Sequence, residues 1–224
     1  RRFCGPTVPL ARIPKFTYKN DEIFHATIEV SHFGNAVLDS TKTTYTIRDE
    51  YGKIYYKEIS NNRTIPVGNC IQLGEVNYPL ASITSPAKLN LEVCIEGTHF
   101  ANDWDFWVYP AVVETNQGNV YITDTFNEKA LETLASGGNV LITAARKITY
   151  GQGIVQQFTP VFWNTSWFKM RPPHTTGIWV NNNHPLFKNF PTEYHSNLQW
   201  WELLNNAQVM LFSDFAYEFE PLVQ

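Results

Sequence analysis

Hydrophobic and polar residues alternate with period two over much of the first half of the chain. The apolar residues at every second position of "KLNLEVCIEG" are Leu89, Leu91, Val93 and Ile95. Similar runs occur in "EIFHATIEVSHF", "TTYTIRD", "GKIYYKEI" and "NCIQLGEV", with turn residues between them. Short strands that are separated by turns, with no helical pattern between them, predict an immunoglobulin-like β-sandwich over residues 16–110. The Cys…Trp…Cys signature of antibody domains is absent.

The stretch "NDWDFWVYP" at residues 102–110 has two interpretations. If Trp104 and Phe106 face inward, the stretch is the last strand of the sandwich. Alternatively, Trp107 and Tyr109 form an exposed platform on which a sugar ring stacks. The regular alternation with Asp103 and Asp105 favours the strand and core interpretation.

After Pro110 the pattern changes to strand, helix, strand. "NVYIT" is an apolar run typical of a buried strand. "NEKALETLA" has one apolar helical face. Thr125 and Glu128 form a T-x-x-E capping box, with Thr125 as the N-cap, and Gly137 supplies the left-handed residue after the helix. The next strand is predicted at Asn139–Ala144. A β-α-β unit of this kind builds a parallel sheet, so residues 111–224 are predicted to form an α/β domain.

Two further elements are predicted near the end of the chain. "SNLQWWELLNN" indicates a helix that begins at a capping box of Ser196 and Gln199. "AQVMLFSD" after it indicates another buried strand. The 50 residues between Arg146 and His195 have no clear period and are rich in aromatic residues and proline. A loop this long inside a domain is usually functional.

Charge and composition exclude several classes of partner. The formal net charge of −4 gives no general attraction to nucleic acid or anionic membranes, and no apolar stretch is long enough to span a bilayer. The three cysteines have no C-x-x-C spacing, so neither a zinc site nor a disulfide framework is indicated. The start of the chain lacks the apolar core of a signal peptide and indicates a piece of a longer polypeptide.

The predicted α/β domain lacks the signatures of catalysis. No G-x-S-x-G or G-x-C-x-G follows the strand at 139–144, and no cysteine lies beyond residue 94. His174, His184 and His195 are too widely spaced to argue a metal site. Glu193, Glu202 and Asp214 could supply the pair of carboxyls that a glycosidase needs, but nothing in the spacing of these three residues requires such a pair. We therefore expect no catalytic residue, no metal and no cofactor.

Four stretches together resemble one family. They are "RRFCGPTVPLARIPKFTYKNDE", "EVSHFG", "NDWDFWVYP" and "HPLFKNFPTEYHSNLQWWELLNNAQ". They are similar to the C-terminal region of bacterial glycoside hydrolase family 2 proteins, the β-galactosidase-like enzymes of polysaccharide degraders. In that family a (β/α)₈ barrel with paired catalytic glutamates comes first, and those glutamates have no matching positions here.

The resemblance implies a domain organisation. Residues 1–15 would be a linker from a preceding catalytic barrel, and residues 16–110 the immunoglobulin-like sandwich. Residues 111–224 would be a flavodoxin-like domain, similar to class I glutamine amidotransferases, that lacks the cysteine nucleophile. A complete domain of this kind would add at least one more strand after "AQVMLFSD", so the resemblance implies a truncated domain. The resemblance further implies a periplasmic or secreted protein.

We therefore expect non-catalytic accessory domains that support a glycoside hydrolase, with the remaining domains of that hydrolase as partners. The alternative is a carbohydrate-binding module that binds an oligosaccharide through Trp163, Trp167, Trp179 or Trp201. A third alternative is a small hydrolase within the long loop. If the chain is a binding module, we expect exposed tryptophans beside Asn or Asp. If it is a scaffold, we expect a flat apolar patch without a pocket. If it is a hydrolase, we expect carboxyls that converge in a cleft.

Overall fold

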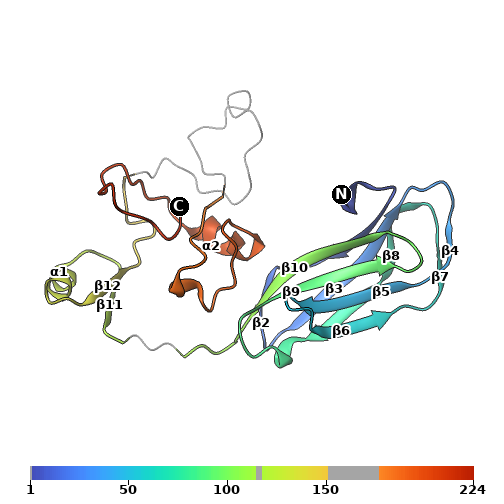
Figure 1. Ribbon diagram of the computed structural model, residues 1–224, viewed down its shortest axis with the longest axis horizontal. Coiled ribbons are helices and arrows are strands. Elements are labelled where there is room, and N and C mark those ends of the chain that lie inside the picture. Colours follow the sequence, from blue (N-terminus) through green and yellow to red (C-terminus); the bar gives the residue numbers. More distant parts are fainter. Residues whose placement is uncertain (1, 115–117, 151–176) are drawn as a thin grey trace, which may run out of the picture. The chain divides into compact units, whose positions relative to one another are not determined.

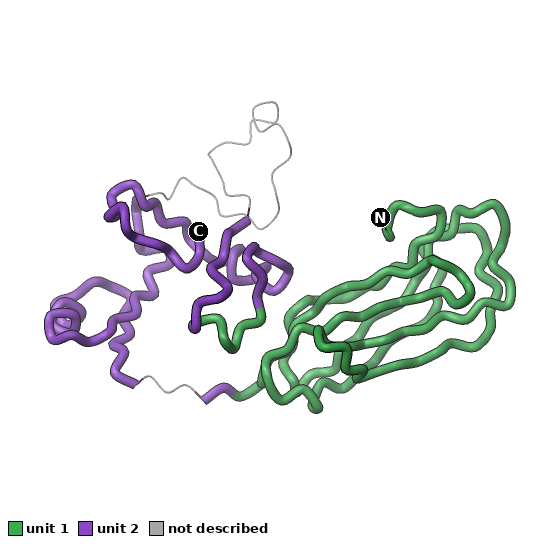
Figure 2. The backbone as a smooth tube through the Cα atoms, in the orientation of Figure 1, with its two compact units in different colours: residues 1–112, 186–191 green, residues 113–185, 192–224 purple. Residues whose placement is uncertain are grey.

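The computed structural model describes residues 2–114, 118–150 and 177–224. The chain divides into two compact units (Figure 2). The first comprises residues 1–112 and 186–191, and the second comprises residues 113–185 and 192–224.

The first unit is a β-structure. Its strands are β1 (Thr7–Arg12), β2 (Thr17–Lys19), β3 (Ile23–His32), β4 (Leu38–Thr41), β5 (Thr43–Asp49), β6 (Ile54–Ile59), β7 (Arg63–Ile65), β8 (Gly68–Pro79), β9 (Ala87–Ile95) and β10 (Ala101–Tyr109). Short 3₁₀ turns lie at Arg2–Cys4, Leu80–Ser82 and Pro185–Phe187. One sheet has the order β1-β3-β8 and the other β2-β10-β9-β5-β6, with β4 and β7 as a separate pair (Figure 1). All pairings are antiparallel except that of β2 with β10.

A single hydrophobic core joins the two larger sheets. Strand β3 alternates buried and half-buried residues along its length, and β9 buries Leu89 and every second residue after it to Ile95. Side chains of β3 and β10 meet in this core, where the rings of Phe24 and Phe106 stack with centroids 4.1 Å apart. The alternation read from the sequence is therefore the core pattern of a two-sheet sandwich.

Strand β10 resolves the two interpretations of "NDWDFWVYP". Phe106 and Val108 lie in the core, and Trp104 packs against it. Trp107, on the opposite side of the strand, is only 1% exposed. Tyr109 is half-buried, and its ring stacks on that of Phe190 with centroids 5.9 Å apart. The core interpretation is confirmed, and a sugar platform at Trp107 is excluded because its ring faces are covered.

The second unit contains the predicted β-α-β segment. Strands β11 (Val120–Thr123) and β12 (Asn139–Ile142) are parallel and are connected through helix α1 (Glu128–Ala135). The helix is followed by Gly137 with φ of +80°, as the sequence predicts. A 3₁₀ turn at Leu198–Trp200 leads into α2 (Trp201–Asn206).

The predicted fold class, an immunoglobulin-like sandwich followed by a flavodoxin-like or amidotransferase-like α/β domain, is wrong as a whole. The described part of the second unit has only the two-stranded sheet β11-β12 and two short helices, so no doubly wound parallel sheet is present there. The first unit instead contributes most of the regular structure, and it is all strand apart from short turns. The molecule is predominantly β.

The apolar run "AQVMLFSD" is the main cause of this error. Residues 207–214 form no strand. Instead, the rings of Phe212, Phe215 and Phe219 contact one another with centroids 4.7–5.4 Å apart. A short apolar run is equally compatible with a buried strand and with an irregular aromatic cluster, because periodicity alone does not distinguish them.

Candidate functional site: the Trp179 pocket

Residues 178–181 form a short extended segment of the second unit that is paired with other parts of the chain on both of its sides. The backbone N–H of Val180 donates to Tyr194 O (2.8 Å), and Ser196 N–H donates to Ile178 O (3.0 Å). On the other side, Trp179 and Gln224 exchange two hydrogen bonds of 2.6 and 2.9 Å. Residues 178–181 therefore lie between residues 194–196 and residues 222–224 in an antiparallel arrangement.

This pairing decides which side chains share a face. Successive side chains of an extended segment point to opposite faces. Val180 is fully buried, whereas its neighbour Trp179 is 48% exposed. His195 lies directly opposite Trp179 on one side and Gln224 on the other, so the three form one row across the exposed face. Asn181 follows Trp179 on the same face.

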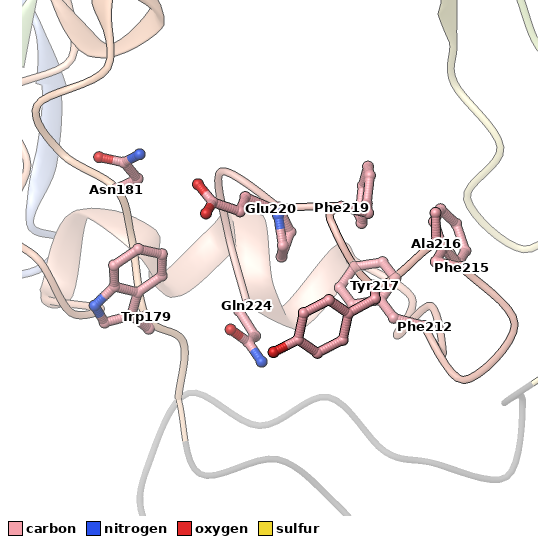
Figure 3. A pocket seen from close by; sticks show the side chains of 10 residues that line it. Trp179, Asn181, Phe212, Phe215, Ala216, Tyr217, Phe219, Glu220 and Gln224 are labelled. Atoms are coloured by element: carbon pink, nitrogen blue, oxygen red, sulfur yellow. The ribbon is translucent and has the colours of Figure 1, made fainter.

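This face is one wall of a pocket of about 650 Å³ (Figure 3). The lining residues are Trp179, Asn181, Phe212, Phe215, Ala216, Tyr217, Phe219, Glu220, Pro221 and Gln224. In Figure 3 the carboxamide of Gln224 lies between Trp179 and Tyr217. The volume is within the range of small-molecule sites, roughly 300–1,000 Å³.

The pocket combines aromatic surface with polar groups. Phe212, Phe215 and Phe219 form the aromatic cluster described above, and Tyr217 is almost fully exposed. Asn181 and Gln224 contribute carboxamides, which both donate and accept hydrogen bonds. Glu220 contributes a carboxylate. Beside this wall, His195 Nε2 lies 3.5 Å from a carboxylate oxygen of Glu193.

Buried residues support the pairing segments. Trp200 and Leu204, on the 3₁₀ turn and α2, are at most 8% exposed. The indole N–H of Trp200 donates to Thr192 Oγ1 over 2.8 Å, which fixes the chain just before residues 194–196. The stretch "FPTEYHSNLQWWEL" therefore builds one side of the arrangement that holds Trp179.

The structure describes two of the four predicted carbohydrate-binding tryptophans, and one of these two lines this pocket. Trp179 does so, and Trp201 is 47% exposed on α2 but is not among the lining residues. Trp163 and Trp167 lie outside the described residues. Sequence reasoning missed Gln224 because its proximity to Trp179 depends on pairing between segments more than 40 residues apart. It missed Asn181 because a residue two positions from Trp179 shares its face only when the segment is extended.

A second cavity, of about 800 Å³, lies at the carboxyl ends of β11 and β12. Its lining is mostly apolar and includes Phe126, Ile142 and Met210. At its edge the Lys147 ammonium donates a hydrogen bond to Asp124 and lowers the pKa of that carboxyl. Asp124 is therefore a paired surface carboxylate, and the cavity offers few polar groups to orient a ligand.

Metal-ligating residues do not cluster in the part of the chain that the structure describes. Within residues 2–114, 118–150 and 177–224, no group of three or more His, Cys, Asp or Glu side chains is arranged to hold a metal ion. Cys4, Cys70 and Cys94 are free thiols. In the same residues, no helix is long and apolar enough to cross a membrane.

Two family models match the chain, one in each half. A domain of unknown function (DUF8488) matches residues 22–110, and another domain of unknown function (DUF8487) matches residues 121–224. These boundaries fall close to the ends of the sandwich strands and the start of β11. No curated protein matches the sequence.

Solved structures that are similar to parts of the chain include glycoside hydrolases. A β-glucuronidase of Parabacteroides merdae is 10% identical, with a TM-score of 0.33, over 46% of this chain and 13% of the enzyme. A family 123 glycoside hydrolase from Clostridium perfringens, which hydrolyses glycolipid glycans, is 8% identical, with a TM-score of 0.31, over 51% of this chain and 30% of the enzyme. This chain therefore spans less than a third of the length of either hydrolase.

A protein of a different class is similar to this chain with a comparably low identity and TM-score. A conjugative transposon lipoprotein from Bacteroides eggerthii is 11% identical, with a TM-score of 0.28, over 45% of this chain and 96% of the lipoprotein. All three TM-scores are below 0.5, so these likenesses do not establish a shared fold or a shared function.

Proposed function

We propose that this chain is a non-catalytic accessory region of a glycoside hydrolase of the β-galactosidase-like group, and that it contacts carbohydrate at the Trp179 pocket. The observation that supports the carbohydrate contact is the half-exposed indole of Trp179 in one row with His195 and Gln224. The remaining domains of the hydrolase are its partners, and the proposed location is the periplasm or the cell exterior.

The chemistry of the pocket matches that of a sugar ring. A pyranose has an apolar face of C–H groups and a rim of hydroxyls that each donate and accept hydrogen bonds. A large aromatic ring such as that of Trp179 packs against the C–H face. The carboxamides of Asn181 and Gln224 suit the hydroxyl rim, because each offers both a donor and an acceptor.

The link to a glycoside hydrolase rests on the sequence resemblance. The four stretches that resemble family 2 proteins lie almost entirely within the described residues, and two of them bear on the proposal. "NDWDFWVYP" is β10 of the sandwich and the residue after it, and "FPTEYHSNLQWWEL" contains His195 of the pocket face and the buried Trp200. The same segment that carries the resemblance therefore helps to build the proposed carbohydrate contact.

A purely structural role is the second candidate. It predicts a flat apolar surface without a pocket. The concave wall around Trp179, with polar groups beside aromatic ones, favours the binding role. The cavity at the ends of β11 and β12 is the feature that fits the structural role better, since its lining is mostly apolar.

Binding is tested with the purified chain, a panel of galactosides and plant and host oligosaccharides, and calorimetric titration. We expect saturable binding by the wild type that weakens at least about tenfold, or about 1.4 kcal/mol, in Trp179→Ala. Trp201→Ala is the matched control, because Trp201 is equally exposed and lies outside the pocket. Binding that survives Trp179→Ala, or that is lost in Trp201→Ala alone, would reject the pocket as the contact site.

The non-catalytic part of the proposal has its own assay. The chain is incubated with nitrophenyl glycosides at high protein concentration, and release of nitrophenol is followed. We expect no turnover above the buffer control. Turnover that persists through repeated purification would mean that the chain is itself a hydrolase.

A further inference from the structure

We propose that the Trp179 pocket selects neutral pyranosides and rejects sugars that carry a carboxylate or a sulfate. This inference rests on the proposed carbohydrate contact and names its ligand class. It starts from the distribution of charge over the segments that build the pocket. Those segments are residues 177–181, 193–196 and 211–224.

The acidic and basic residues on the segments that build the pocket are unevenly distributed. Residues 189–224 contain no lysine and no arginine. The acidic residues in this range are Glu193, Glu202, Asp214, Glu218 and Glu220. Residues 177–181, "GIWVN", are uncharged. Every charged side chain on the pocket-building segments is therefore acidic, apart from the titratable His195.

Glu220 places one of these charges in the pocket wall itself. A uronate bound against Trp179 would bring a second carboxylate into the same pocket, where no described lining residue is a cation. Two like charges in one site repel each other, and proteins that bind carboxylates normally supply arginine or lysine. Rejection of the charged sugar follows from this repulsion.

His195 does not supply the missing cation. It lies opposite Trp179, but its Nε2 faces Glu193 at 3.5 Å. Any positive charge on His195 is therefore offset locally by that carboxylate. A neutral sugar meets no such obstacle, because its hydroxyls can donate to Glu220 and can both donate to and accept from Asn181 and Gln224.

The test compares matched pairs of ligands on the whole chain. The probes are methyl β-galactopyranoside with methyl β-galactopyranosiduronate, and methyl β-glucopyranoside with methyl β-glucopyranosiduronate. Each pair differs only at C6. We expect the neutral member of at least one pair to bind at least about tenfold more tightly than its uronate at low ionic strength, and the ratio to shrink in high salt because salt screens the repulsion.

Two charge-removing variants locate the effect. Glu220→Gln is expected to reduce the neutral-to-uronate ratio at least threefold, because it removes the charge that repels the uronate. Glu202→Gln removes the same charge from an exposed position on α2 outside the pocket, and it is expected to leave the ratio unchanged.

The outcomes separate this inference from the proposed function. Equal binding of both members of a pair, tighter binding of the uronate, or an equal effect of the two variants would overturn the charge selection and leave carbohydrate binding in place. If no member of either pair and no oligosaccharide of the wider panel binds, the proposed carbohydrate contact fails, and the selection fails with it.

Discussion

At the scale of single residues, the structure assigns different roles to chemically similar neighbours. Trp107 is covered within the sandwich, and Trp179 is half exposed at a pocket. Trp104 and Phe106 could be placed from the sequence because their strand alternates regularly. The burial of Trp107 could not be predicted from the sequence, because it depends on what covers the outer face of β10. On that face the Lys88 ammonium lies 5.9 Å from the centre of the Trp107 ring.

Tyr45 and Gly74 make a close contact between the two sheets of the sandwich. Tyr45 is 1% exposed, and its hydroxyl has no hydrogen-bond partner among the described residues. A Cβ atom added to Gly74 would lie 2.9 Å from that oxygen. Gly74→Ala is therefore expected to lower the free energy of unfolding by about 1–3 kcal/mol, as measured by chemical denaturation of the sandwich.

Two further variants check the cause of this loss. Gly68→Ala, also in β8, is the matched control because its added Cβ would meet Ile71 only at an ordinary 3.6 Å. Tyr45→Phe removes the crowded oxygen and is expected to restore most of the stability lost in Gly74→Ala. By itself Tyr45→Phe should cost little, because the hydroxyl has no partner to lose. Failure of this rescue would show that the contact with the hydroxyl is not the cause.

At the scale of elements, helix α1 begins two residues later than the capping box in the sequence predicts. The side chain of Asn127, and not that of Thr125, accepts a hydrogen bond from the backbone N–H of Ala130 (3.0 Å). Both residue types are good N-caps, so the sequence leaves two possible helix starts that are two residues apart. The choice is made by the turn after β11, where Thr123 Oγ1 donates to Thr125 O over 2.9 Å.

Asn127→Ala is expected to destabilise α1 by about 1 kcal/mol, since it removes the acceptor of the cap. Hydrogen exchange of the amides in Glu128–Ala135 measures this directly, because the effect is local. Thr125→Ala is the control and should change their exchange much less. The reverse order of effects would mean that Thr125 is the cap in solution.

The elements that the sequence predicted best are those with long, regular periods. The strands β3 and β9 follow their period of two almost residue by residue. The β-α-β segment is also where it was expected, with parallel strands. The run at 207–214 was misassigned because a few apolar residues without regular alternation do not specify a strand, and the pairing partners that decide it are distant in the sequence.

At the scale of the whole molecule, the two units differ in how much apolar surface they bury. The sandwich has a continuous core to which β3, β5, β8, β9 and β10 all contribute. In the described part of the second unit, the buried hydrophobic residues are Ala130, Val180, Trp200 and Leu204. Leu131 and Leu134, on the apolar face predicted for α1, are about half exposed. Burial of apolar surface is the main favourable term in folding, so the units should differ in local stability.

Hydrogen exchange followed by mass spectrometry tests this difference on the intact chain. We expect amides of β3 and β9 to be protected at least about 100-fold more strongly than those of β11, α1 and β12, a gap of about 2.7 kcal/mol in opening free energy. The comparison is restricted to amides that donate within a sheet, because β9 is paired with both β5 and β10 whereas β12 is paired with β11 alone among the described strands. Equal protection would show that the difference in buried apolar surface does not set the local stability of the two units. A rise in protection of residues 177–181 on adding a neutral sugar would further tie local order in this unit to occupation of the Trp179 pocket.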